Sequence, residues 1–249
     1  MIKKILLSLL LSAGTLYADI TGGELSLGIF SHAPDGSASY TLPYIGAGTS
    51  ADVEHALHWD EETDIVLKAY IEHPVPMLPN IKLAFSDLSH EGAGPVTDFI
   101  WGSIDIPLGN IQSSMNLQMY DLTLYYELLD NWAEVDAGVT LRYFDGDISV
   151  RTAVLGEGTD FDLFVPMLYA KARFNIPATD ISLQAEANAI SYDDSTLYDY
   201  ELAIRYTLAM GLGVEGGYRA IHVDSEDLAD GLVADMDFSG FFVSAIWDF

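Results

Sequence analysis

The residues best suited to chemistry in this sequence are two histidines and a carboxylate in the stretch His55-Ala-Leu-His58-Trp-Asp60. Two imidazoles and a carboxylate close together could bind a transition metal or act in acid–base catalysis. A single His-x-x-His in a polar segment is a weak signal, and solvated loop residues are the alternative. No other His, Ser and acidic residues have the spacing of a catalytic motif. We therefore expect no enzyme and no cofactor, and the metal content stays open.

A second candidate is the acidic stretch 224–237, whose carboxylates are Asp224, Glu226, Asp227, Asp230, Asp235 and Asp237. Oxygen ligands of this kind could gather Ca²⁺ or Mg²⁺, although the spacing is not that of an EF-hand. A solvated acidic loop is the alternative interpretation. Divalent cations at the acidic loops are thus one expected class of partner.

The basic residues have the most informative distribution. Without the two lysines of an N-terminal leader, the chain has eight basic and 38 acidic residues, a formal charge of −30. Such a charge argues against nucleic acid as a partner. Seven of the eight basic residues, all but Arg151, fall on the polar face of a segment that alternates polar and apolar residues. We predict that these faces line a lumen, with the set Lys68, Lys82, Glu127, Asp136, Arg142, Lys171, Arg173, Glu186, Glu201, Arg205, Glu215 and Arg219.

Basic and acidic residues occur together on these polar faces for a physical reason. Carboxylates enclosed in a narrow interior repel one another unless cations lie among them. The main interpretation is a network of ion pairs and hydrogen bonds that fills a small barrel. A narrow pore lined by both signs is the alternative.

Alternating segments that would form the strands carry these side chains. The clearest is 180–189, in which Ser182, Gln184 and Glu186 alternate with alanine and leucine. Ten strands are predicted, at about 21–31, 64–72, 81–89, 115–128, 134–145, 164–174, 180–189, 198–206, 211–222 and 238–249. Long loops are predicted at 32–62, 90–112, 146–162 and 223–237. Phe99–Ile106 also alternates, but an eleventh strand would break the even number of bacterial barrels, so it is assigned to a loop.

The last stretch, 238–249, indicates what kind of barrel this is. One face of it consists of Phe241, Val243, Ala245, Trp247 and Phe249. In a soluble domain such a strand would be an aggregation-prone edge. In a closed transmembrane barrel it pairs with the first strand and faces lipid. It also resembles the terminal signal read by the barrel assembly machinery, with Ser244 where that signal usually has Gly.

The beginning of the chain predicts export. Met1-Ile-Lys-Lys is a basic region, residues 5–11 are apolar, and Ala18 ends a plausible cleavage site. We expect residues 1–18 to be a cleaved signal peptide and residues 19–249 to be the barrel. No later stretch has the length of a transmembrane helix, and there is no cysteine. The predicted fold is all-β, a transmembrane antiparallel up-and-down β-barrel of about ten strands, with eight strands as the alternative.

Several motifs together resemble a known family. They are Gly22-Gly23, the Pro-rich Glu72–Asn80, Leu124–Asn131, Val165–Ala170, Gly217-Tyr-Arg219 and the final Phe249. This set resembles a proteobacterial outer-membrane β-barrel family named for its Gly-Gly motif. The resemblance spans nearly the whole exported chain and implies location and fold. The family has no established activity, so no catalytic residue is implied.

The expectation for function is an integral barrel of the Gram-negative outer membrane, reached after export to the periplasm, with a structural or interaction role and a salt-bridged lumen. The first alternative is a narrow passive channel for small, cationic solutes. The second is an enzyme with a site at the outer rim that acts on lipid or peptide. Outer-membrane lipid and lipopolysaccharide are the expected surroundings.

Overall fold

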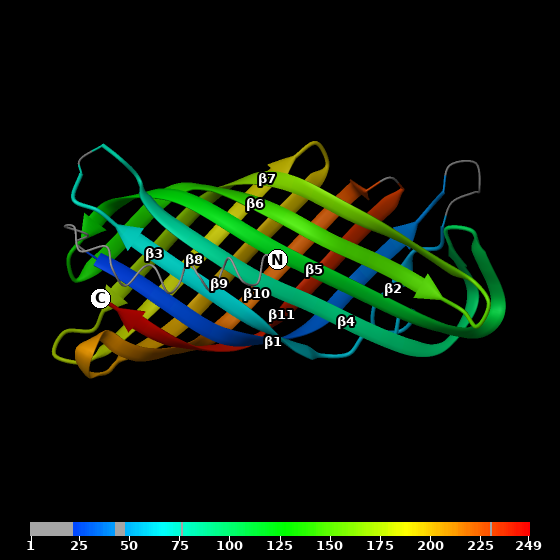
Figure 1. Cartoon of the computed structure of the whole chain (residues 1–249), viewed down its shortest axis with the longest axis horizontal. Coiled ribbons are helices and arrows are strands. Elements are labelled where there is room, and N and C mark those ends of the chain that lie inside the picture. The colour runs from blue at the N-terminus through cyan, green and yellow to red at the C-terminus, as the bar shows by residue number, and fades with distance from the viewer. Residues whose placement is uncertain (1–21, 43–47, 76, 230) are drawn as a thin grey trace, which may run out of the picture.

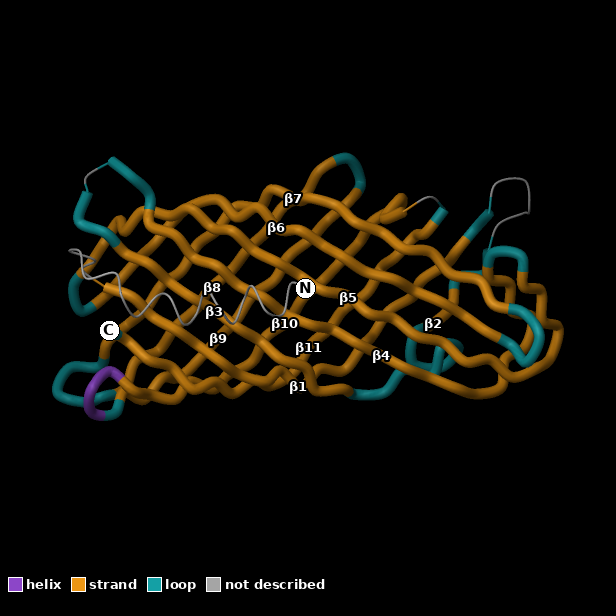
Figure 2. Tube along the Cα trace, viewed as in Figure 1, coloured by secondary structure: helices purple, strands orange, loops and turns teal. Residues whose placement is uncertain are grey.

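The computed structural model describes residues 22–42, 48–75, 77–229 and 231–249, apart from the side chains of residues 227 and 229. The expected signal peptide, residues 1–18, lies outside the described residues. Almost all of the described chain is β-strand, arranged as an elongated barrel whose loops lie mostly toward its two ends (Figure 2). None of the helical segments in the described part approaches the length and hydropathy needed to cross a membrane.

Ten strands form a closed antiparallel barrel, in which each strand pairs with the next and the last pairs with the first (Figure 1). These strands are β1 (Gly22–Tyr40), β3 (Glu62–Glu72), β4 (Asn80–Trp101), β5 (Ile104–Asp130), β6 (Ala133–Arg151), β7 (Gly156–Asn175), β8 (Ile181–Tyr192), β9 (Ser195–Thr207), β10 (Leu212–Ala229) and β11 (Leu232–Asp248). A two-residue strand, β2 (Ala51–Asp52), adds to β1, and a single 3-10 turn, η2 (Ala209–Gly211), precedes β10. The prediction of a ten-stranded barrel is confirmed, and the eight-stranded alternative is wrong.

Part of the way along each long strand, polar and apolar side chains exchange the faces of the barrel wall on which they lie. On β6 the outward residues are apolar from Val135 to Tyr143 and polar from Asp145 onward, whereas the inward residues are polar up to Arg142 and apolar from Phe144. The other long strands repeat this change. The half that holds Gly22 and Phe249, which we call the membrane half after the location expected from the sequence, is therefore polar inside and apolar outside. The other half, which we call the extracellular half, is apolar inside and polar outside.

Aromatic residues mark the boundary on the outer surface. Phe85, Tyr120, Tyr143 and Phe164 form a continuous row across β4 to β7, with ring centroids 5.1, 6.2 and 4.7 Å apart. Aromatic girdles of this kind lie at the membrane–water interface of outer-membrane barrels. We call the exposed apolar surface on the terminal side of this row the apolar band.

Three of the four predicted long loops are wrong and the fourth, 32–62, is right only in part, because the strands continue into them. Residues 90–112 complete β4 and β5, which pair as far as Trp101–Ile104. The segment therefore lengthens two strands instead of adding an eleventh. The loops predicted at 146–162 and 223–237 are likewise mostly strand, since β6 pairs with β7 up to Arg151–Gly156 and β10 pairs with β11 up to Ala229–Leu232. In the predicted loop 32–62, β1 continues to Tyr40.

Candidate functional site

A chain of alternating charges crosses the lumen in the membrane half. The Arg142 guanidinium donates to both oxygens of Asp121 at 2.7 Å and to Asp199 at 2.7 Å. Arg219 donates to the same Asp199 at 2.9 and 2.7 Å. Its Nε lies 3.5 Å from Glu201, which in turn pairs with Lys68. Planar guanidinium groups suit this arrangement, because each can bridge two carboxylates.

A second chain lies toward the terminal end of the barrel. Arg205 donates to both oxygens of Glu24 at 2.6 and 2.7 Å and to Glu215 at 2.9 Å. Arg173 lies 3.1 Å from Glu24 and 3.3 Å from Glu134. Glu24 on β1 and Arg205 on β9 are 181 residues apart in the sequence. The network thus ties strands together across the lumen as well as along the wall.

The remaining cations lie among buried tyrosines. Lys82 pairs with Glu186, which also accepts a hydrogen bond from Tyr70 at 2.8 Å. Lys171 pairs with Asp136 at 3.2 Å and lies 4.7 Å from the centroid of the Tyr70 ring. Cation–π contacts of this kind add to the stability of a desolvated ammonium group.

The buried carboxylates of this network equal its basic side chains in number, and the partly exposed Glu134 adds one more acid at the terminal end. Seven carboxylates are buried: Glu24, Asp121, Asp136, Glu186, Asp199, Glu201 and Glu215. Seven basic side chains face them, six of them buried and Arg173 15 % exposed. A cavity among them, between Lys82 and Asp199, has a volume of about 10 Å³, which is room for one water molecule. The described side chains therefore fill the lumen at this level.

Ten of the twelve predicted lumen residues are buried inside the barrel, and Arg173 is partly buried there. Glu127 lies at the terminal mouth of the lumen: it is opposite the buried Asp136 and accepts a hydrogen bond from the buried Asn80, but its own side chain is exposed. A register shift between Glu127 and Leu129 ends the regular alternation at that point. The predicted set lacked Glu24, although its alternation with Leu25 carries the same signal as the others.

The extracellular half holds an apolar core, which the sequence did not indicate. Its mouth is filled by the segment 51–59, in which Val53, Leu57 and Trp59 are almost completely buried. Trp59 donates from its indole nitrogen to Ser113 on β5 at 3.0 Å. This segment forms a second seal above the charged network, and we call it the mouth segment.

Two buried histidines lie beneath the mouth segment. His32 and His90 have ring centroids 4.9 Å apart, and His90 stacks between Trp59 and Phe238 at 5.7 and 5.5 Å. The neighbouring outward residues Ser31, Ser89 and Glu91 are polar, so both histidines lie outside the apolar band. Burial lowers the pKa of each to about 4. His90 Nδ1 donates to the carbonyl of Asp60 at 3.0 Å.

The histidines that the sequence singled out do not come together. His55 is exposed and bonds to Asp52 at 3.0 Å, whereas His58 donates to the carbonyl of Pro95 at 3.1 Å. The hydrogen bond with the Asp52 carboxylate raises the pKa of His55, and the His55 backbone amide helps to lower the pKa of Asp52. In the described part of the chain no three His or acidic side chains gather as metal ligands would.

Acidic residues of the stretch 224–237 point outward from β10 and β11. Asp224 lies opposite Asp235, and Asp237 lies opposite His222, which it contacts at 3.1 Å. Asp230 lies outside the described residues, as does the side chain of Asp227. The stretch that was expected to be an acidic loop therefore belongs mostly to two strands, and its carboxylates make the outer surface of the extracellular half polar.

The predicted assembly signal lies on the outer face of β11. Phe241, Val243, Ala245 and Trp247 are exposed on the apolar band, and Phe249 follows at the end of the chain. β11 pairs with β1 from Leu232–Tyr40 to Asp248–Glu24, so this strand closes the barrel.

Comparison with known proteins agrees on the fold. No family model and no curated protein matches the chain. The outer membrane protease OmpT from Escherichia coli matches with 12 % identity and a TM-score of 0.54, over 94 % of this chain and 98 % of that one. The translocator domain of the autotransporter NalP from Neisseria meningitidis matches with 12 % identity and a TM-score of 0.44, over 98 % and 95 %. A Pseudomonas aeruginosa FadL homologue has 9 % identity and a TM-score of 0.34, over 91 % and 90 %. The match to OmpT supports a fold for this chain similar to the barrel of that outer-membrane protein.

Proposed function

We propose that this protein is a sealed barrel of the Gram-negative outer membrane that works through what its extracellular half contacts, and not by conducting solutes. The apolar band, the aromatic row and the barrel fold support the location. The structural or interaction role predicted from the sequence is the one that fits a filled lumen.

The charged network is the observation that carries the proposal. A pore needs a continuous water-filled path past side chains that solutes can reach. Here seven basic and seven acidic side chains are engaged with one another. Opening a path would separate buried ion pairs, at a cost of several kcal/mol for each. The mouth segment adds a second barrier.

Single-channel conductance of the refolded protein in a planar bilayer tests the proposal. We expect no conductance steps. Insertion is verified by recovering the protein from the bilayer lipid and showing that heating changes its migration on a gel, as expected when a folded barrel unfolds. Removal of residues 53–58 should also leave the bilayer silent, because the charged network remains. Reproducible steps whose ion selectivity changes in Lys171→Glu or Arg205→Glu would instead establish the narrow channel.

A further inference from the structure

The barrel wall is interrupted on one side of the extracellular half. The ladder between β7 and β8 stops at Leu168–Ala189, so Gly156–Met167 of β7 pairs with β6 alone among the described strands. β8 and β9 have 12 and 13 residues, against 19 and 20 in β6 and β7. Figure 1 shows the yellow hairpin of β8 and β9 ending well short of the β6–β7 hairpin.

Above the short hairpin, β7 and β10 contact each other directly without a hydrogen-bonded ladder. We call this contact the seam. A second ladder also ends early: β3 and β4 pair only as far as Val66–Ser86, and beyond that point β4 receives single backbone hydrogen bonds, such as the one from Thr49 to the carbonyl of Ile100. Side chains alone close the wall at the seam, so the two long hairpins can separate there without loss of backbone pairing.

The apolar core is least well covered along the seam. Six hydrophobic residues pack against the core while only partly buried. Four of them lie on the strands that border the seam: Leu163, Val165, Ile190 and Leu228. Apolar side chains that stay partly exposed beside an apolar interior are typical of binding sites for hydrophobic molecules.

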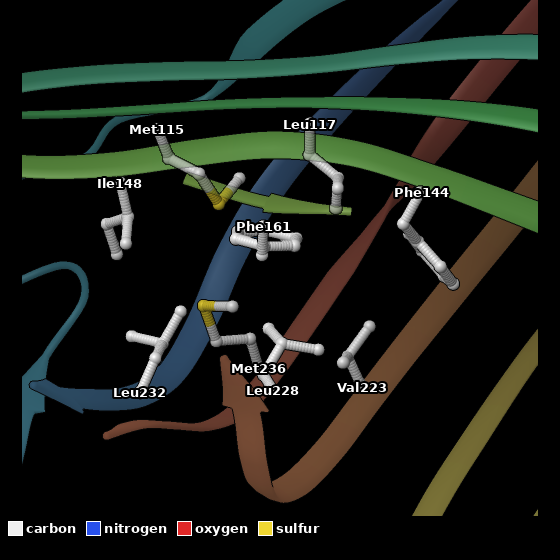
Figure 3. Close-up of a pocket in the computed structure, with 9 residues that line it drawn as sticks. All are labelled: Met115, Leu117, Phe144, Ile148, Phe161, Val223, Leu228, Leu232 and Met236. Atoms are coloured by element: carbon white, nitrogen blue, oxygen red, sulfur yellow. The ribbon is translucent and has the colours of Figure 1, made fainter. Parts of the chain in front are cut away.

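Directly behind the seam is a small apolar cavity (Figure 3). Phe161 of β7 and Val223 of β10 line it from the two sides of the seam. Met115 and Met236 approach it from opposite walls, as Figure 3 shows. Its volume of about 10 Å³ is room for one water molecule only, so a ligand must displace side chains in order to enter. Methionine is suited to that, because its unbranched chain repacks easily.

Position and charge define what can approach the seam. On the β7 border the seam begins at the apolar band, where Phe164 and Leu168 are 65 % and 73 % exposed, whereas on β10 the ladder with β9 continues as far as Asp224. A molecule dissolved in the outer leaflet therefore meets the seam from the side. Asp160 and Asp162 point outward from the same strand, and Asp224 points outward from β10. Carboxylates on both borders repel anionic headgroups and attract cationic ones.

We propose that the seam is a lateral binding site for the hydrocarbon chain of a neutral or cationic amphiphile dissolved in the outer leaflet. The chain enters between β7 and β10 and occupies the space behind Phe161, while the headgroup stays among the outward carboxylates. The site would accept amphiphiles with quaternary ammonium or uncharged headgroups and discriminate against fatty acids. It does not depend on whether the lumen conducts.

The absence of cysteine from the sequence allows a direct test. Leu228→Cys, at the border of the seam, is labelled with a small fluorophore in phosphatidylcholine vesicles. Dodecyltrimethylammonium with bromine on its chain serves as the quencher. Leu141→Cys, which faces lipid on β6, is the matched control for simple partitioning. We expect saturable quenching at Leu228, half-complete at an amphiphile-to-lipid ratio about tenfold lower than the ratio that gives the same quenching by partitioning at Leu141.

Brominated dodecanoate should quench the Leu228 position much more weakly than the cationic probe. Val223→Phe and Ile148→Phe, combined with the labelled site, fill the cavity from different walls and should abolish saturation. Their folding is checked by the heat-dependent gel shift, and either variant suffices. Equal, unsaturable quenching at both labelled positions would overturn the site. Quenching by brominated dodecanoate equal to that by the cationic probe would overturn the proposed selection for headgroup charge. If the amphiphile amount needed for half-complete quenching depended on the aqueous concentration and not on the amphiphile-to-lipid ratio, the lateral route would be overturned.

Discussion

Asp162 of β7 lies directly opposite Asp145 of β6 on the outer wall, and both carboxylates are exposed just beyond the aromatic row. Like charges that face each other across a strand pair are destabilising. We expect Asp162→Asn to raise the free energy of unfolding by a few tenths of a kcal/mol up to about 1 kcal/mol. Urea unfolding in detergent at low and high salt measures this.

Salt should reduce the difference between Asp162→Asn and the wild type, because it screens exposed charges. Asp105→Asn is the matched control, since its cross-strand partner is Ile100. The same experiment in millimolar Mg²⁺ tests the divalent cations expected from the sequence. A gain in stability that is equal for the two substitutions would argue against cross-strand repulsion.

Arg142→Met should be strongly destabilising. The substitution leaves Asp121 buried without its bidentate partner and removes one partner of Asp199. Removal of one member of a buried ion pair costs about 3–5 kcal/mol. Arg151→Met changes the same charge at an exposed site and should cost little. Equal midpoints for the two variants in urea unfolding would show that the network does not stabilise the barrel.

His90→Phe should make the barrel less sensitive to acid. The pKa of His90 in the fold, about 4, is below its ordinary 6.5, so the unfolded chain binds more protons between these values. The stability is therefore complete above about pH 6.5 and declines as the pH falls toward about 4. Phenylalanine keeps the stacking with Trp59 and Phe238 and removes the titrating group.

Unfolding curves between pH 4.5 and 7.5 measure this slope, which we expect to be smaller in His90→Phe than in the wild type. His55→Ala is the control. The raised pKa of His55 has the opposite effect, a contribution that is present at low pH and lost as the pH rises. An unchanged slope in His90→Phe would mean that this histidine does not cause the acid sensitivity.

Gly23→Val should impair closure of the barrel. Gly23 and Phe249 exchange backbone hydrogen bonds at 2.9 Å in both directions, and a Cβ on Gly23 would lie 2.7 Å from the Phe249 ring. We expect a lower fraction of heat-shifted, folded protein on a gel, with partial recovery when Phe249→Ala is added. Gly216→Val is the control, because a Cβ there meets no atom closer than 3.6 Å. Equal folded fractions for the two valine variants would contradict the steric account.

The sequence was sufficient to predict the membrane half, because one alternation runs through it. On β1, Leu25, Leu27 and Ile29 face outward while Glu24 and Ser26 face inward. Beyond Phe30 the phase inverts, so that odd positions become polar and even positions apolar. A strand prediction that requires apolar residues to stay at every second position ends at this inversion, and it assigns the residues that follow to a loop. Most of the wrongly predicted loop residues have this origin, whereas Phe99–Ile106 was assigned to a loop because of the expected even number of strands.

No sequence pattern comparable to this alternation predicts the side-chain contacts within the extracellular half. His32 and His90 are 58 positions apart, and neither belongs to a motif. Their contact depends on strand register and on Trp59 of the mouth segment, which folds back over them. The filled lumen was easier to anticipate, because charge must be neutralised wherever carboxylates are enclosed.

The inversion between the two halves also determines the depth of the barrel in the bilayer. The outward face changes from Tyr143 to Asp145 within one step along β6, and from Phe164 to Asp162 on β7. Sinking the protein by one such step would draw the carboxylates of Asp145 and Asp162 into hydrocarbon, and raising it would expose the aromatic row to water. Both displacements are costly. In membranes of different thickness we therefore expect the surrounding lipids to stretch or compress around this barrel, while the barrel itself keeps its level.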